Sequence, residues 1–127
     1  MYRMYGILML NDVNEDPDVI ARMFEPYEWL ERKHYDLDPE MYSMVYCNEL
    51  ETEKEEIDGE LLERIYYMLN MNFPEDYRSR SLSVSDIILF DDSAYYVDSI
   101  GFHKLDDFEY SRFAFNFSLI DYFLPFC

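Results

Sequence analysis

The stretch from Ile87 to Val97 reads Ile87-Ile88-Leu89-Phe90-Asp91-Asp92-Ser93-Ala94-Tyr95-Tyr96-Val97. Two apolar runs, 87–90 and 94–97, flank the polar triplet 91–93, and this pattern predicts a β-hairpin. Gly101 indicates a bend before a further short strand over 102–105. Because strands joined by such short connections pair antiparallel, this part of the chain predicts an antiparallel sheet.

The first half of the chain predicts two more strands and two short helical segments. An apolar and aromatic run from Tyr2 to Leu10 predicts the first strand, and a run from Met41 to Cys47 predicts the second, after a turn at 36–39. Asp16 followed by Pro17 is typical of a helix N-cap and first helical residue. Pro26 cannot continue that helix, so a second short turn carrying Trp29 and Leu30 is expected after it.

A longer helix is predicted from Gly59 to about Asn70, with Asp58 as its cap. Its apolar residues recur at helical spacing and its charged residues fall on the other side. The apolar set is Leu61, Leu62, Ile65, Met68 and Leu69, and the charged set is Glu60, Glu63 and Arg64. The expected fold class is therefore α+β, a small, mostly antiparallel sheet packed with two or three helices.

Size and composition favour one domain over residues 1–127. The mass is 15.5 kDa, half of the residues are apolar and 19% are aromatic, which is enough for a hydrophobic core. Three glycines and five prolines leave no convincing linker. The Phe-rich stretch 113–126 is expected to complete the core, and the alternative is a surface that contacts another chain.

The formal net charge is -18. Residues 11–63 hold 18 of the 28 acidic residues and 4 of the 10 basic ones, so the acidity belongs mostly to the first half. Such a field disfavours nucleic-acid phosphates and anionic lipid and favours basic partners. We expect no direct nucleic-acid binding and no membrane association.

Two cysteines, Cys47 and Cys127, are too few for the disulfide framework of a small secreted fold, although one disulfide stays open. Neither a signal peptide nor a membrane-spanning segment is evident. The sequence is thus expected to encode a cytoplasmic protein.

An acidic run occupies residues 49–63, where Lys54 is the only basic residue. Its acids are Glu49, Glu51, Glu53, Glu55, Glu56, Asp58, Glu60 and Glu63. In an extended segment alternate residues would project on one side about 6.6 Å apart, and such a row could enter a groove lined with arginine and lysine. The alternative is a solvated loop and helix start, where acids also suit the helix dipole.

Catalytic and metal patterns are weak. Ser83, Ser85, Asp86 and His103 suggest a nucleophile, but the Gly-x-Ser-x-Gly elbow is missing, and Asp86 is better interpreted as a turn residue that accepts backbone N–H groups. The histidines and cysteines are scattered, and the acid pairs 91–92 and 106–107 lack an EF-hand pattern. We expect no catalytic residue, no metal and no cofactor.

Three segments carry a resemblance to a known family: Asn72-Phe73-Pro74-Glu75-Asp76-Tyr77-Arg78, Ser81-Leu82-Ser83-Val84-Ser85-Asp86-Ile87-Ile88 and Tyr95-Tyr96-Val97-Asp98-Ser99-Ile100-Gly101-Phe102. They resemble the YodL-like domain over residues 2–106, which leaves 107–127 as a Phe-rich C-terminal extension. The chain departs from the family at Ser79-Arg80, where a glycine is common. We assign the shared motif to the scaffold; its residues are Ser83, Val84, Ser85, Asp86, Tyr96, Val97, Asp98, Gly101 and Phe102.

The resemblance implies an accessory protein of conjugative or other mobile elements. Combined with the acidity, it leads to the expectation of a non-enzymatic inhibitor that occupies a basic nucleic-acid-binding surface of a host defence nuclease, of the anti-CRISPR or antirestriction type. The expected partner is a CRISPR effector nuclease or a restriction enzyme. One alternative is an interaction module in conjugation or element maintenance; the other is an enzyme acting near Asp86, Asp98 or His103.

Overall fold

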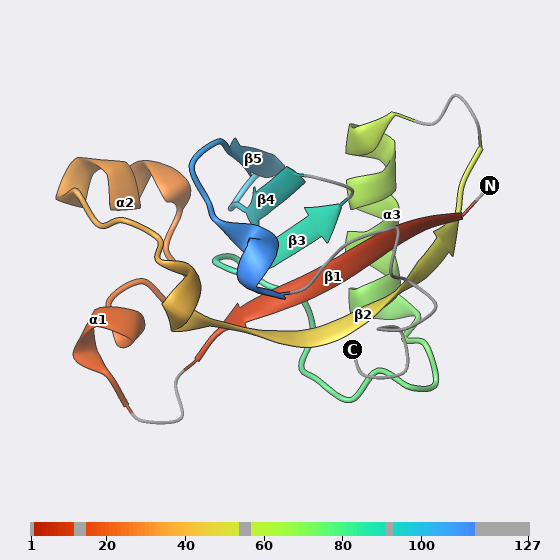
Figure 1. Cartoon of the computed structure of the whole chain (residues 1–127), viewed down its shortest axis with the longest axis horizontal. Helices are drawn as coiled ribbons and strands as arrows, with labels where there is room; N and C mark the ends of the chain where they lie inside the picture. Colours follow the sequence, from red (N-terminus) through yellow and green to blue (C-terminus); the bar gives the residue numbers. More distant parts are fainter. Residues whose placement is uncertain (1, 12–14, 54–56, 91–92, 114–127) are drawn as a thin grey trace.

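Five antiparallel strands form the centre of a computed structural model that describes residues 2–11, 15–53, 57–90 and 93–113 (Figure 1). The order across the sheet is β2-β1-β3-β4-β5. The strands are β1 (Tyr2–Leu10), β2 (Tyr42–Glu51), β3 (Ile87–Phe90), β4 (Ser93–Val97) and β5 (Phe102–Leu105). The helices α1 (Pro17–Ile20), α2 (Tyr27–Lys33) and α3 (Asp58–Met71) accompany the sheet, with short 3-10 turns at Pro39–Met41 and Tyr110–Phe113. This is the α+β architecture that the sequence predicts.

The pairing predicted between the two apolar runs 87–90 and 94–97 is confirmed. β3 pairs with β4, and Ile88 lies opposite Tyr95 in the register. Gly101 has φ +73 and precedes β5, so it forms the predicted bend. A left-handed φ of this kind is one that glycine adopts readily and other residues avoid.

The second strand extends beyond its predicted end at Cys47 and continues to Glu51. The reason is its partner: β1 begins at Tyr2, and Tyr2 lies opposite Glu51, so the ladder continues as far as β1 offers pairing groups. β2 is an edge strand, where charged residues are tolerated. A register shift between Ile7 and Leu8 marks a bulge opposite Met44 to Tyr46.

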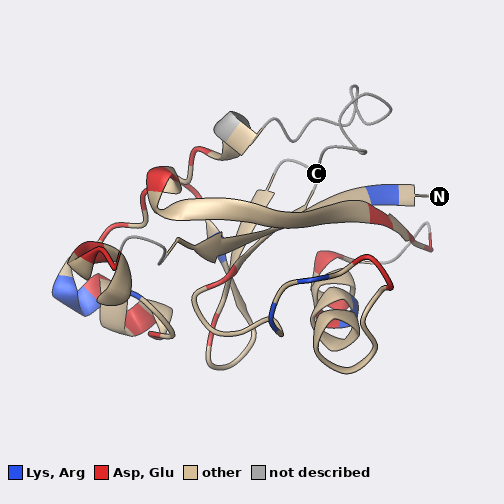
Figure 2. Ribbon diagram, turned by 90° about the horizontal axis from the view of Figure 1, so that it is seen from below, with Lys and Arg blue, Asp and Glu red and all other residues tan. Residues whose placement is uncertain are grey.

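The helix α3 covers one face of the sheet (Figures 1 and 2). Leu61, Leu62, Ile65 and Leu69 are buried there against strand residues such as Tyr5 and Ile88, whereas Glu60, Glu63 and Arg64 are exposed, as predicted. The prediction of Asp58 as the cap is wrong. Ile57 is the N-cap, and its apolar side chain makes no capping bond. Asp58 is the first helical residue, and its carboxylate binds Arg3 and Tyr95.

The other face of the sheet packs against the segments around α1 and α2. Val19, Leu30 and Phe108 are buried there against Leu8, Tyr96 and neighbouring strand residues. Asp16 caps α1 by accepting the Asp18 N–H at 2.9 Å, and Pro17 is the first helical residue, as predicted. α2 follows Pro26 and ends at His34, whose φ of 58 is left-handed.

No helix in the described part of the chain is long and apolar enough to cross a membrane. The expectation for the Phe-rich stretch concerns mainly residues 114–126, which lie outside the described residues. Phe108, before that stretch, is buried and meets the Tyr42 ring edge-on at 5.8 Å.

Candidate functional site

The acidic run lies at one end of the molecule, where β2 finishes and α3 begins (Figure 1). Glu49 is half-buried and Glu51 exposed in β2, Glu53 is exposed beyond it, Asp58 is half-buried, and Glu60 and Glu63 are exposed on α3. Glu55 and Glu56 lie outside the described residues. The run is therefore gathered at one end of the fold.

The described acids of the run do not share a face of the sheet. Leu50 packs against the cluster beneath α3, so strand alternation directs Glu49 and Glu51 toward the opposite face. Glu60 and Glu63 belong to α3, on the first face. Among the residues that the structure describes, the extended row of carboxylates expected from the sequence is present only as the Glu49 and Glu51 pair within β2.

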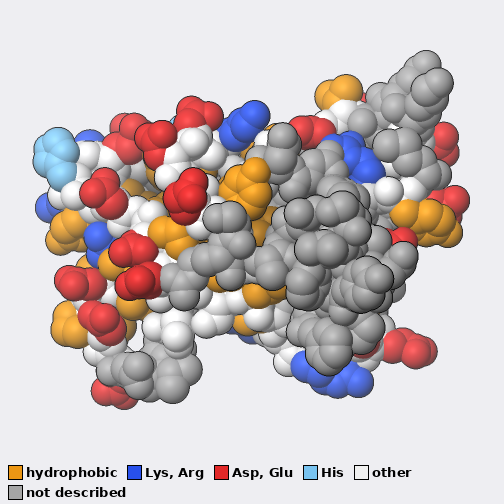
Figure 3. Space-filling model, in the orientation of Figure 1, with side chains coloured by type: hydrophobic (Ala, Val, Ile, Leu, Met, Phe, Trp, Pro, Cys, Tyr) orange, Lys and Arg blue, Asp and Glu red, His pale blue; other side chains and the backbone are white. Residues whose placement is uncertain are grey.

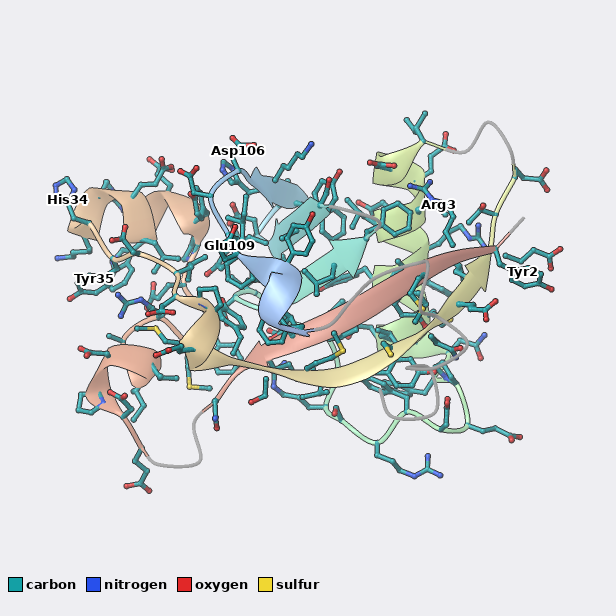
Figure 4. All side chains as sticks on the ribbon, viewed as in Figure 1. Tyr2, Arg3, His34, Tyr35, Asp106 and Glu109 are labelled. Carbon is teal, nitrogen blue, oxygen red and sulfur yellow. The ribbon has the colours of Figure 1, made fainter. Side chains whose placement is uncertain are left out.

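Two arginines outside the acidic run bind residues of the run. Arg3 Nη2 lies 3.2 Å from Asp58 Oδ1, and the Tyr95 hydroxyl donates to Asp58 Oδ2 at 2.9 Å. Arg3 extends from β1 toward α3 (Figure 4). Arg64 Nη2 donates to the Glu51 carbonyl at 3.1 Å. Asp58 thus connects α3 to the sheet.

A second acidic surface lies at the opposite end of the fold, between α2 and the segment that follows β5. A cavity of about 600 Å³ opens there. Its floor is apolar, with Leu30 and Phe108 buried and Leu105 half-buried. Its rim carries the exposed acids Glu31, Asp36, Asp106 and Asp107, together with His34, His103 and Lys104. We call this cavity with its rim the acidic groove.

Figure 3 shows acidic side chains gathered over the α2 end of the molecule, with hydrophobic side chains between them. His34 and Tyr35 lie at the tip of α2 and Asp106 lies beyond β5 on the other side (Figure 4). The acidic surface therefore faces solvent on an open side of the fold.

Aromatic stacking fixes the two walls of the acidic groove. The Tyr27 and His103 rings stack with centroids 3.8 Å apart and planes 27° apart, which joins α2 to β5. The Tyr27 N–H donates to Asp98 Oδ1 at 3.2 Å. Burial, and then the negative charges of Glu31, Asp106, Asp107 and Asp36, raise the pKa of the Tyr27 hydroxyl. The acids of both walls thus act together on one side chain inside the groove.

Arg22 holds the loop that carries Asp36. It is 9% exposed, its Nε donates to the Asp36 carbonyl at 2.7 Å and its Nη1 to the Asp18 carbonyl at 2.6 Å. The guanidinium also lies over the Tyr35 ring, 4.9 Å from the centroid. Arg22 thus bonds the backbone of Asp36, and the Asp36 side chain is exposed.

The motif residues assigned to the scaffold form a buried polar centre. Asp86 is fully buried, accepts two bonds from Arg80 at 2.8 and 2.7 Å, and accepts the Ser83 N–H at 2.8 Å. This is the turn role interpreted from the sequence. Burial raises the pKa of Asp86, against the lowering effects of Arg80 and the Ser83 N–H.

The same centre attaches the α1–α2 segment to the sheet. Ser85, at φ 85, accepts the Phe24 N–H on its hydroxyl oxygen and the Tyr42 hydroxyl on its carbonyl. The Tyr96 hydroxyl donates to the Glu25 carbonyl at 2.5 Å. Val97 is buried in β4 in the core beneath α3, where Phe102 also packs and meets the Tyr66 ring, whereas the half-buried Val84 packs against the core on the other face of the sheet. These side chains connect separate parts of the fold.

The residues of the enzyme alternative have structural partners. Asp86 has no exposed surface, Asp98 accepts the Tyr27 and Ser99 N–H groups, and His103 stacks on Tyr27. Within the described residues no hydrogen bond joins a serine hydroxyl to His103. The described residues also contain no group of three or more metal-ligating side chains placed to hold an ion.

Among protein families, the YodL-like domain matches residues 7–108, which is most of the chain. The chain belongs to the YodL-like domain family. No match was found among curated proteins or among solved structures. The matched region of this YodL-like protein contains both the buried polar centre and every residue that lines the acidic groove.

Sequence reasoning missed the acidic groove. It treated Asp106 and Asp107 only as candidate metal ligands, and Asp36 only as part of a turn. The sequence did carry an indication, since residues 31–37 and residues 103–108 each combine acids with a histidine and with apolar residues. The two segments are about seventy residues apart, however, and the sequence offered no reason to bring them together.

Proposed function

We propose that this YodL-like protein is a non-enzymatic inhibitor that occupies a basic nucleic-acid-binding surface of a host defence nuclease. The target class in the proposal is a CRISPR effector or a restriction enzyme, and the site of action is the cytoplasm. Arginine- and lysine-lined channels in such enzymes normally hold phosphates, and a surface rich in carboxylates competes for the same charges.

The observation that carries the proposal is the excess of exposed carboxylates over nearby cations. The net charge is -18, and Glu51, Glu60 and Glu63 at one end of the fold are exposed. The side chains of the shared motif are used inside the fold, which supports a role by surface charge over a role by catalysis. The mobile-element setting implied by the family supports the choice of a defence nuclease.

The test uses purified nuclease complexes with and without guide RNA, and measures binding and cleavage of target DNA. A variant with Glu49→Lys, Glu51→Lys, Glu60→Lys and Glu63→Lys is compared with the wild type. We expect the wild type to inhibit cleavage and the variant to lose inhibition. Inhibition should weaken as salt is raised, because the Debye length falls from about 8 Å at physiological ionic strength to about 3 Å at 1 M.

The matched control reverses the same number of charges at exposed acids outside both the acidic run and the acidic groove: Glu15→Lys, Asp18→Lys, Glu28→Lys and Glu75→Lys. If both variants lose inhibition equally, only total charge matters and the acidic run is not the contact. If the wild type neither binds nor inhibits any such nuclease, the proposed function is wrong.

One observation favours a second candidate, an interaction module in conjugation or element maintenance. The described acids of the run are divided between two faces of the sheet, and Arg3 and Arg64 lie among them. In that case the run serves solubility, and reversing its charges leaves partner binding intact.

A further inference from the structure

The acidic groove has features beyond its charge. A volume of about 600 Å³ lies within the range of about 300–1,000 Å³ that ligand-binding cavities occupy. The exposed lining of the groove is more polar than that of most small-molecule cavities, which suits a charged ligand. β5 is the last strand of the sheet, so in the described structure no further strand covers this wall.

The rim carboxylates are available to a ligand. In the described part of the chain, the side chains of Glu31, Asp36, Asp106 and Asp107 form no ion pair and no hydrogen bond. Lys104 is the one lysine or arginine in the lining. The groove therefore offers several negative charges in excess, around a cavity with an aromatic wall.

We propose that the acidic groove binds an arginine-containing basic segment of a partner protein. A guanidinium suits this lining in two ways. Its planar fork bonds carboxylates in pairs, and its flat face stacks on the exposed His103 ring, on the side away from Tyr27. The aliphatic part of the arginine side chain lies on the half-buried Leu37 and Leu105.

This inference rests on the proposed function for the positive charge of the partner. It adds a second contact, separate from the acidic run, and names the side-chain class that this contact recognises. The two fail separately. Peptide binding in the groove is measurable without any nuclease, and inhibition by the acidic run is measurable in a variant whose groove is neutralised.

The experiment measures the binding of a fluorescein-labelled peptide that alternates arginine with glycine, by fluorescence anisotropy with the whole chain. The groove variant carries Glu31→Gln, Asp36→Asn, Asp106→Asn and Asp107→Asn. We expect affinity to fall about tenfold, because each exposed charge contact contributes a few tenths of a kcal/mol and four are removed. A citrulline peptide, which keeps the planar group without its charge, should bind far more weakly than the arginine peptide.

Two controls separate the groove from general charge. The variant Glu15→Gln, Asp18→Asn, Glu28→Gln and Glu75→Gln removes four exposed charges outside the groove and the acidic run, so it changes the net charge equally and should bind the peptide like the wild type, apart from a small long-range effect. Lys104→Gln removes the cation of the rim and should strengthen binding about twofold. Far-UV circular dichroism verifies that each variant is folded.

Equal losses in the two four-residue variants would overturn the proposal, because the peptide would then respond only to net charge. Failure of the wild type to bind the arginine peptide at low salt would also overturn it, as would a lysine peptide and an arginine peptide binding with the same affinity.

Discussion

The buried pair of Arg80 and Asp86 gives the sharpest test of how this fold is held together. Asp86 has no exposed surface, whereas the Arg80 side chain is 38% exposed. The two bonds between them, at 2.8 and 2.7 Å, form a bidentate pair. The perturbation is Arg80→Met, which keeps a long side chain and leaves the Asp86 carboxylate buried with only the Ser83 N–H as a donor.

The magnitude follows from burial. Removing one partner of a fully buried ion pair costs about 3–5 kcal/mol, since the other charge is left uncompensated. Arg80 keeps contact with water, so solvent already screens part of the pair, and we expect a loss of about 2–3 kcal/mol in the free energy of unfolding. Urea unfolding followed by circular dichroism at pH 7 measures this value. Arg78→Met is the matched control, because Arg78 is an exposed residue that bonds only backbone carbonyls of Glu75 and Tyr77; we expect a change within about 0.5 kcal/mol.

The pH dependence has a definite sign. Burial raises the pKa of Asp86 in the folded state, so the folded protein binds this proton more tightly than the unfolded chain does. Protonation therefore adds stability as the pH falls through the folded-state pKa. Loss of Arg80 raises that pKa further, so the deficit of Arg80→Met should shrink as the pH is lowered from 7 toward the acid range.

A second substitution makes the reasoning refutable. Asp86→Asn should destabilise the wild type, because it removes the charge that pairs with Arg80. In the Arg80→Met background the same change should be neutral or stabilising, since it removes an unpaired buried charge. If Asp86→Asn costs the same in both backgrounds, the two side chains are not coupled and this account of the centre is wrong.

Three other substitutions test neighbouring contacts by the same unfolding measurement. Tyr42→Phe removes the hydroxyl that donates to the Ser85 carbonyl at 2.8 Å and should cost about 1–3 kcal/mol, whereas Tyr66→Phe on the exposed side of α3 should cost almost nothing. Asp58→Asn weakens a pair whose side chains are 14% and 47% exposed, so a loss within about 1 kcal/mol is expected, and a larger one would contradict the view of this pair as solvent-screened. Gly101→Ala places a side chain at φ +73 and should lower the free energy of unfolding by about 1 kcal/mol, although nothing lies within 4 Å of the new Cβ. Gly59→Ala in α3 should instead raise the free energy of unfolding by up to about 1 kcal/mol. Equal effects of the two substitutions would refute the conformational argument.

The parts of the fold that local sequence determines were predictable. The hairpin from Ile87 to Val97 is closed by neighbouring residues, and the buried stripe of α3 follows from helical spacing alone. The end of β2 was not predictable in the same way, because Glu49 and Glu51 are extended only where β1 pairs with them. Strand pairing between distant segments overrides the low strand preference of glutamate.

In the candidate sites, too, the features set by neighbouring residues were predictable and those set by contacts between distant segments were not. The acidic run is contiguous, so its charge could be recognised from the sequence, but the division of its acids over two faces depends on the sheet. Asp58 was misjudged as a cap because its partners Arg3 and Tyr95 are 55 and 37 residues away. The acidic groove was missed for the same reason, since α2 and the end of β5 meet only in the folded chain.

The buried polar centre lies apart from the rim of the acidic groove, the binding surface proposed above. Ser85 and Asp86, the two buried polar residues of the shared motif, accept hydrogen bonds from Phe24, Tyr42 and Arg80. These hydrogen bonds orient the α1–α2 segment against the sheet. That segment forms one wall of the acidic groove. Substitutions in the motif should therefore lower the free energy of unfolding first, and peptide affinity only through it. Substitutions on the groove rim should change affinity while the melting temperature stays nearly constant, and a rim variant that lost both together would contradict this separation of scaffold from binding surface.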